Sequence, residues 1–346
     1  MASRISLCMI VRNEERHLSR CLNSVCPHVD EIIVVDTGST DRTREIAASY
    51  TEQIHNYRWD DHFAEARNYA MSLATGDWLL WMDADEVLEG GKELRKLDEP
   101  SFERDLLLTI LTLHETAVSP GQQEMYKMEQ PRLFRNRQGL SFRYRIHEML
   151  NIEDVLPQGP WNQEIRSFPM VLVHEGYRED TTQTAFKQQR NLSLLHKTIE
   201  QKEEHPWLEY HLASEWYRMG LYPDTIQAVN LSIQRFLKAG QLPPPLLYKL
   251  KYSALLAAGE WKIASAGIEK AIHLYPDYVD LHYAKGSVRM AEQRWEEAAL
   301  AFEECLRLGE SQTRYLIQCG TGSFLAREAL SECRQKKGPG EAPGQG

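Results

Sequence analysis

The chain has 346 residues, of which 42% are hydrophobic and 26% are charged, and its formal net charge is −10. This composition is typical of a globular protein of about two domains, and the negative charge argues against a general nucleic-acid-binding protein, which carries a basic stripe. No window approaches the roughly 20 apolar residues that a membrane-spanning helix needs, and no charged leader precedes a long apolar run. We therefore expect a soluble cytoplasmic protein without a membrane span and without a nucleic-acid partner.

Residues 1 to about 90 alternate between strand and helix patterns. Strands are expected at 5–11, 31–39 and 77–85, and helices at 14–25, 40–49 and 63–74. The strands are nearly continuous runs of Ile, Val and Leu, which indicates a parallel sheet that is covered by helices on both faces. Ligands of such sheets bind at the carboxyl ends of the strands.

Polar residues follow each of these three strands, and the last strand ends in Asp83-Ala84-Asp85. Residues two apart in an extended segment point to the same side, so both carboxylates can face one ligand. Carboxylates would repel a diphosphate unless a hard divalent cation lay between them, so the pair suggests Mg²⁺ or Mn²⁺. The alternative is an ordinary turn, because turns favour Asp.

The rest of the first half is less periodic. The sequence has neither a G-x-x-x-x-G-K-[ST] loop nor a G-x-G-x-x-G turn after its first strand, so P-loop and dinucleotide sites are disfavoured. The segments 106–113, 128–150 and 169–177 are expected to hold further strands that close the sheet and to bring two histidines, His147 and His174, inward. We expect one catalytic domain over residues 1–178.

Helical patterns replace the alternation from residue 179 onward. Ala228, Ala264 and Ala298 occupy equivalent places in three segments, and Trp261 and Trp295 recur in the last two. The spacing of about 34 residues resembles that of tetratricopeptide repeats, which stack to bury their apolar faces. We expect this all-α region over 179–335, followed by a disordered tail at 336–346. Its concave face would hold a peptide or a second copy of the chain in a homodimer.

Three segments together resemble the family 2 glycosyltransferases of the GT-A fold: SLCMIVRNEERHLSRCLNSV, EIIVVDTGSTDRT and DDHFAEARNYAMSLATGDWLLWMDADE. Two further segments, RYRIHEML and VLVHEGY, followed by the helical repeats, are similar to bacteriocin glycosyltransferases of the sublancin type, which attach sugars to a peptide. The resemblance implies an α/β GT-A domain, with a Rossmann-like mixed sheet and helices on both faces, followed by the repeats.

The resemblance also implies a site for a UDP-sugar. Asp36 would accept a hydrogen bond from the uracil imide, and the remaining nucleotide-binding positions would be Val11, Asn13, Glu14, Asp61, Arg67, Asp83 and Ala84. Asp36 could instead cap the helix that starts near Thr40. Arg67 could instead form an exposed ion pair with Asp60 or Asp61.

The same resemblance implies the metal site and the catalytic base. Asp83 would touch the ribose and the metal, Asp85 would ligate the metal directly, and His174 would reach the same ion. Glu148 would take the proton from the acceptor, and its alternative is a salt bridge with Arg143 or Arg145. His174 could instead be a hydrogen-bonded structural residue.

The implied activity is an inverting, metal-dependent transfer of a glucose-type hexose from a UDP-sugar to a Ser or Cys side chain of a peptide or protein. A second possibility keeps the transferase and changes the acceptor to a glycan or a lipid-linked sugar. The opposing class is a non-catalytic repeat scaffold with a degenerate nucleotide site. The presence of Asp36, Asp83 and Asp85 argues against it, because a scaffold has no need of acids gathered at one edge of the sheet.

Overall fold

The computed structural model describes residues 2–119, 122–156, 165–174, 181–201 and 205–336. The chain divides into two compact units, residues 1–187 and 188–346. The first holds a mixed sheet with helices and the second is helical, so the expected fold class is confirmed. The boundary expected at residue 178 and residues 337–346 of the expected tail lie outside the described residues.

The sheet of the first unit has the strand order β3-β2-β1-β4-β7-β6-β10-β5. The strands are β1 (Ile5–Val11), β2 (Glu31–Asp36), β3 (Ile54–Asn56), β4 (Trp78–Trp81), β5 (Glu86–Glu89), β6 (Leu107–Ser119), β7 (Gln122–Arg135) and β10 (Arg166–His174). A small separate ribbon pairs β8 (Phe142–Arg143) with β9 (Met149–Leu150). The strands β1, β2, β3 and β4 are mutually parallel, and β7 runs against β4 and β6.

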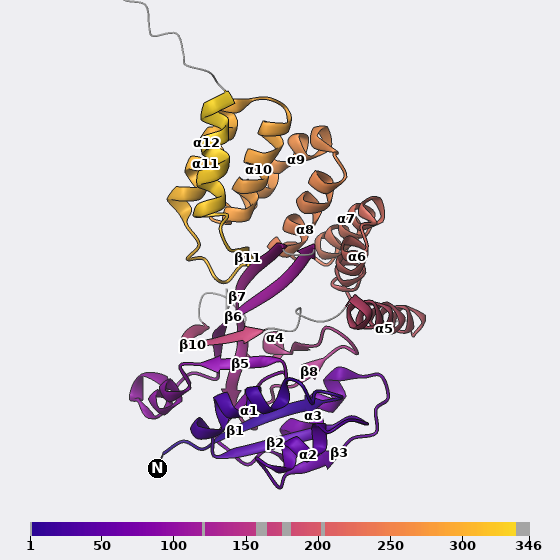
Figure 1. The fold of residues 1–346 in the computed structure, drawn as a ribbon, viewed down its shortest axis with the longest axis vertical. Helices are drawn as coiled ribbons and strands as arrows, with labels where there is room; N and C mark the ends of the chain where they lie inside the picture. The colour runs from indigo at the N-terminus through magenta and orange to yellow at the C-terminus, as the bar shows by residue number, and fades with distance from the viewer. Residues whose placement is uncertain (1, 120–121, 157–164, 175–180, 202–204, 337–346) are drawn as a thin grey trace, which may run out of the picture. The chain divides into compact units, whose positions relative to one another are not determined.

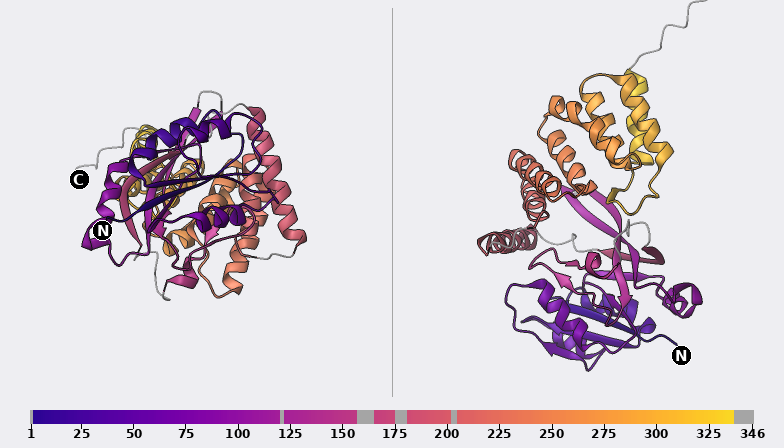
Figure 2. Two further views of the ribbon diagram at one scale, coloured as in Figure 1. Left: turned by 90° about the horizontal axis from the view of Figure 1, so that it is seen from below. Right: turned by 180° about the vertical axis from the view of Figure 1, so that it is seen from behind.

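Helices cover both faces of the parallel part of this sheet, as Figures 1 and 2 show. The helices of this unit are α1 (Leu18–Val25), α2 (Thr43–Ala48), α3 (Phe63–Leu73) and the short α4 (Ile152–Val155), with 3₁₀ helices at Cys26–His28, Gly91–Asp98 and Pro100–Phe102. Leu7 and Met9 of β1 share a core with α1, whereas Cys8 shares one with Ala64 and Ala70 of α3. Alternate residues of one strand thus face opposite layers, which explains its continuous apolar run.

Several expected elements are shorter than the sequence pattern suggested. The strand expected over 31–39 ends at Asp36, and the helix expected over 40–49 spans Thr43–Ala48. The helix expected from residue 14 begins at Leu18, and residues 15–17 form a turn before it. The strand expected over 77–85 ends at Trp81, so Asp83 and Asp85 lie in the turn that leads to β5. Strand β3 lies in a segment for which the sequence predicted no strand.

The helical unit stacks its helices in chain order: α6 against α7, α8 against α9, α10 against α11, and α11 against α12. Its elements are α5 (Thr181–Glu200, beginning in the first unit), α6 (Leu208–Arg218), α7 (Tyr222–Lys238), α8 (Pro245–Ala257), α9 (Trp261–Leu274), α10 (Val279–Ala291), α11 (Trp295–Leu308), the two-residue strand β11 (Ile317–Gln318) and α12 (Phe324–Lys336). Ala228, Ala264 and Ala298 are all buried, as small residues at repeated helix crossings should be.

Candidate active site

The directions of the strands bring several polar positions to one edge of the sheet. β1, β2 and β4 are parallel, so the positions that follow Val11, Asp36 and Trp81 share that edge. β6 and β4 both run against β7, and β10 is parallel to β6, so His174 at the end of β10 reaches the same edge. The edge is the one at which parallel sheets bind ligands.

The turn after β4 is closed by Glu86. The backbone N–H of Asp83 donates to Glu86 Oε2 (2.9 Å), and the backbone N–H of Glu86 donates to the carbonyl of Asp83 (3.1 Å). Glu86 is fully buried, and the guanidinium group of Arg132 donates to both its carboxylate oxygens, at 2.6 and 3.1 Å. This reciprocal pairing fixes the backbone that carries Asp83 and Asp85.

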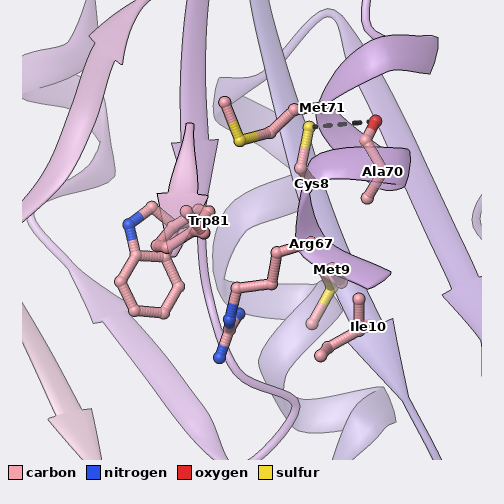
Figure 3. Close-up of a pocket in the computed structure, with 8 residues that line it drawn as sticks. Cys8, Met9, Ile10, Arg67, Ala70, Met71 and Trp81 are labelled. Atoms are coloured by element: carbon pink, nitrogen blue, oxygen red, sulfur yellow. Dashed lines mark hydrogen bonds between the residues drawn. The ribbon is translucent and has the colours of Figure 1, made fainter. Parts of the chain in front are cut away.

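Arg67 of α3 links two of the acids. Its Nη2 donates to Asp83 Oδ1 (2.8 Å) and its Nε donates to Glu148 Oε1 (2.5 Å). Its guanidinium carbon lies 4.3 Å from the centre of the Trp81 ring, and Figure 3 shows the side chain leaving the apolar residues around Cys8 and Met71 to lie beside Trp81. Arg67 is therefore a buried partner of the acids, and the alternative of an exposed pair with Asp60 or Asp61 is wrong.

Glu148 is likewise placed by its partner. Arg143 pairs with Asp154, and Arg145 donates to the backbone carbonyls of Asp60 and Asp61, at 3.2 and 3.1 Å. The ion pair that Glu148 makes is with Arg67. The carboxylate thus lies beside Asp83, on the side of the sheet edge where the nucleotide-binding positions are expected.

The charges of this cluster shift its pKa values. Burial tends to raise the pKa of Asp83, but the guanidinium groups of Arg67 and Arg132 outweigh it and lower that pKa to about 2. Burial raises the pKa of Glu86 to about 6, against the opposing charge of Arg132. Asp83, with 33% of its side chain exposed, is more accessible to a ligand than Glu86, which is fully buried.

His174 lies beside Asp85. Its Nδ1 is 3.3 Å from Asp85 Oδ1, and its ring centre is 5.2 Å from that of His114 on β6. Burial tends to lower the pKa of His174, but the hydrogen bond and the charge of Asp85 raise it overall; burial also tends to raise the pKa of Asp85, and His174 lowers it overall. Burial lowers the pKa of His114 to about 3, so this histidine is neutral.

The loops after β1 and β2 are joined to each other. Asn13, at a φ of 56°, accepts from the backbone N–H of Thr40 (2.8 Å) and donates its own backbone N–H to Ser39 Oγ (3.0 Å). Asp36 accepts from the backbone N–H of Ser39 (3.0 Å) and from Arg44 Nη1 (3.1 Å). Asp36 therefore closes the turn before α2, and α2 itself begins at Thr43.

The remaining expected positions lie around this cluster. Glu14 lies with its Oε2 3.1 Å from His17 Nδ1, and burial raises its pKa against the opposing hydrogen bond with His17. The carbonyl of Val11 accepts from Thr37, and Ala84 is buried between the two aspartates. Asp61, at a φ of 65°, accepts from the indole N–H of Trp59 (2.9 Å).

The acids and cations together leave a charge for a divalent ion. Asp83, Glu86 and Glu148 pair with the guanidinium groups of Arg67 and Arg132, and Asp85 pairs with His174. With His174 neutral, as a metal ligand must be, the four carboxylates and two guanidinium groups leave a formal charge of −4 + 2 = −2. Within the described ranges, no three His, Cys, Asp or Glu side chains are already gathered as a metal site. Asp85 and His174 nevertheless offer an oxygen and a nitrogen atom side by side, and the carboxylate oxygen is the kind of ligand that Mn²⁺ and Mg²⁺ prefer.

Two residues of the cluster, Glu86 and Arg132, are not among the site residues expected from the sequence. Glu86 directly follows Asp85 in the chain, and Arg132 lies in the segment EQPRLFR of β7. Strand β7 is rich in polar and charged residues, so one arginine within it does not stand out as buried. The sequence therefore identifies neither the burial of Arg132 nor its pairing with Glu86.

Comparison with known proteins identifies the family. Residues 6–147 match the model of Glycosyl transferase family 2. A TPR repeat-containing protein of Synechococcus elongatus is 34% identical over 290 residues, which cover 82% of this chain and 69% of that protein. The SPbeta prophage-derived glycosyltransferase SunS of Bacillus subtilis is 26% identical over 239 residues, covering 66% of this chain and 53% of SunS. The chain belongs to glycosyl transferase family 2, with a C-terminal region of TPR-like helices.

Solved structures add a limited comparison. Glucosyl-3-phosphoglycerate synthase from Mycobacterium tuberculosis, in complex with Mg²⁺ and uridine diphosphate, is 22% identical over 32% of this chain and 44% of that one, with a TM-score of 0.28. A similarity of this size carries no argument about the ligands of this chain. In the described part of the chain, no helix is both long enough and apolar enough to cross a membrane.

Proposed function

We propose that the chain is an inverting, metal-dependent glycosyltransferase that moves a hexose from a UDP-sugar to a Ser or Cys side chain of a peptide or protein. Family membership supports glycosyl transfer. The main structural support for a UDP-sugar site is the cluster of Asp83, Asp85, Glu148 and Arg67 at the carboxyl edge of the parallel strands. Its residual negative charge fits a divalent cation bound together with a diphosphate.

The nucleotide would bind along the edge from β2 to β4. Asp36 would accept the uracil N–H, with the backbone of Val11 and the side chain of Asn13 beside the base and Glu14 close by. The hydrogen bonds between the loops after β1 and β2 support this, because they hold these positions in one rigid rim. Asp61 and the backbone of Ala84 are proposed to line the same nucleotide site.

Asp85 and His174 would hold the metal ion, and Asp83 would reach it and the ribose from its exposed side. A bound Mg²⁺ or Mn²⁺ would offset the charge that develops on the UDP leaving group. The resting contacts fit this assignment, because Asp85 already faces His174 whereas Asp83 is held by Arg67.

Glu148 is proposed to take the proton from the acceptor nucleophile. Arg67 holds one of its oxygens at 2.5 Å, which fixes the carboxylate relative to Asp83 and hence to the donor sugar. The proton would pass from the acceptor hydroxyl or thiol to Glu148 as the nucleophile displaces UDP in line. Positioning and electrostatic stabilisation would supply most of the rate.

The peptide acceptor is supported by the likeness of the chain to sublancin-type glycosyltransferases and by its TPR-like helices, which in general bind a peptide or a second subunit. The experiment incubates the full chain with a UDP-sugar, Mn²⁺ and a library of Ser- and Cys-containing peptides, followed by mass spectrometry. The expected result is the gain of one hexose on a peptide. Transfer only to a glycan or a lipid-linked sugar would refute the proposal of a peptide acceptor. If no UDP were released with any acceptor, the non-catalytic scaffold would be favoured over a transferase.

A further inference from the structure

The buried ion pair Glu86–Arg132 contacts the turn that carries Asp83 and Asp85. Both oxygens of Glu86 are engaged by Arg132, and Oε2 also accepts the backbone N–H of Asp83. Glu86 has no exposed side-chain surface and Arg132 has only 3%. A charged pair this deep is costly to desolvate, and an apolar pair of similar volume would often serve stability as well.

Arg132 is itself held in place on three sides. Its guanidinium carbon lies 3.6 Å from the centre of the Trp81 ring, Gln130 Oε1 accepts from its Nη2 at 2.8 Å, and Glu86 takes its two terminal nitrogens. From this position Nη1 lies 4.0 Å from Asp83 Oδ2. The positive charge of Arg132 therefore lies near Asp83 Oδ2 without a direct hydrogen bond. The other oxygen, Asp83 Oδ1, pairs with Arg67 at 2.8 Å.

We propose that Glu86 and Arg132 are positioning residues for the cation–diphosphate site: they lock the Asp83-to-Glu86 turn so that the carboxylates of Asp83 and Asp85 meet one divalent cation. This inference rests on the proposed function. Glu86 ties the backbone at Asp83, and Arg132 keeps Glu86 from turning into the site, where it would compete for the cation. The pair contributes to metal-dependent nucleotide binding without touching the nucleotide.

The test separates this role from a contribution to folding. The double variant Glu86→Met/Arg132→Met removes both charges together and fills the volume with apolar side chains, which leaves no buried charge unpaired. The matched control is Arg135→Met. Arg135 lies on the same strand and stacks on Trp78 at 4.5 Å, but its guanidinium group donates to backbone carbonyls at 102, 103 and 105.

The measurement is the affinity of the full chain for UDP by calorimetry, with Mn²⁺ and with EDTA, together with the thermal midpoint of each variant. The ratio of the two dissociation constants is the metal enhancement. We expect the metal enhancement of the double variant to be at least tenfold smaller than that of the wild type, while its affinity for UDP in EDTA stays within threefold of wild type. Arg135→Met is expected to keep the wild-type enhancement. A folded double variant with the wild-type enhancement would overturn the inference.

A second variant keeps the inference testable if the double variant does not fold. Arg132→Lys retains the charge but lacks the two-nitrogen fork that grips Glu86. We expect it to lower the enhancement by several-fold, and a wild-type enhancement in Arg132→Lys would contradict the positioning role. If the wild-type chain itself shows no metal-dependent binding of UDP, the proposed function fails and this inference with it. Enhancement retained in the variants refutes the positioning role alone.

Discussion

Replacing Arg67 with Met removes the buried cation that pairs with two acids, of which Asp83 is partly exposed. Arg67 is 9% exposed in its side chain and pairs with both Asp83 and Glu148. Removing one partner of a buried pair costs about 3–5 kcal/mol, and we expect about 3 kcal/mol here because water reaches the third of Asp83 that is exposed. In a unit of 187 residues this loss lowers the thermal midpoint by about 6–12 °C.

Differential scanning calorimetry of the full chain measures this loss. The matched control is Arg42→Met, which removes an exposed arginine that pairs with Glu45 at 3.0 Å, with 70% and 68% of the two side chains exposed. The control is expected to leave the midpoint unchanged, since exposed pairs contribute little. If Arg67→Met lowered the midpoint no more than Arg42→Met does, the conclusion that the buried Arg67 stabilises the unit by pairing with Asp83 and Glu148 would be refuted.

Four further changes test other parts of the account. Asp85→Asn should keep the thermal midpoint of the wild type and lose metal-dependent UDP binding in calorimetry. Metal-dependent binding equal to that of the wild type would refute the role of Asp85 as a metal ligand. Glu148→Gln should keep UDP-sugar binding and lose transfer in a product assay, and a joint loss would argue against its role as base. Burial tends to raise the pKa of Glu31, but hydrogen bonds from its neighbours lower it to about 2. Its contribution, about 3 kcal/mol at most, is therefore present above its ordinary pKa and lost as pH falls from about 4.5 to 2, a loss that urea unfolding of Glu31→Gln should not show. Gly286→Ala would place a Cβ 2.6 Å from the buried ring of Phe302, which should cost about 1–3 kcal/mol in the helical unit; Phe302→Leu should restore part of it in a denaturant titration.

The strands of the site could be predicted from sequence because their burial is nearly uniform. β1 was expected at 5–11 and lies at Ile5–Val11, since a parallel strand that is covered on both faces leaves an unbroken apolar run. Strand β3 was not anticipated, because its three residues Ile54–Asn56 carry too little pattern to distinguish a strand from a loop.

The polar contacts were less accessible to sequence reasoning. The strand order explains why Asp83, Asp85 and His174 could be expected at one edge, and the structure brings them there. The partners of Arg67 and Glu148 could not be inferred, because Arg67 and Glu148 are 81 residues apart and meet only through the packing of α3 against β8. Sequence spacing identifies which side chains reach an edge, but tertiary packing decides which of them pair.

The central claim is that the acid cluster after β4 holds a divalent cation together with UDP. The most direct measurement is a calorimetric titration of the full chain with UDP, with Mn²⁺ or Mg²⁺ and with EDTA, in parallel with Asp85→Asn. The account predicts that Mn²⁺ or Mg²⁺ strengthens UDP binding to the wild-type chain and that this metal enhancement is lost in Asp85→Asn. Absence of UDP binding with either metal, or equal binding in EDTA, would contradict it.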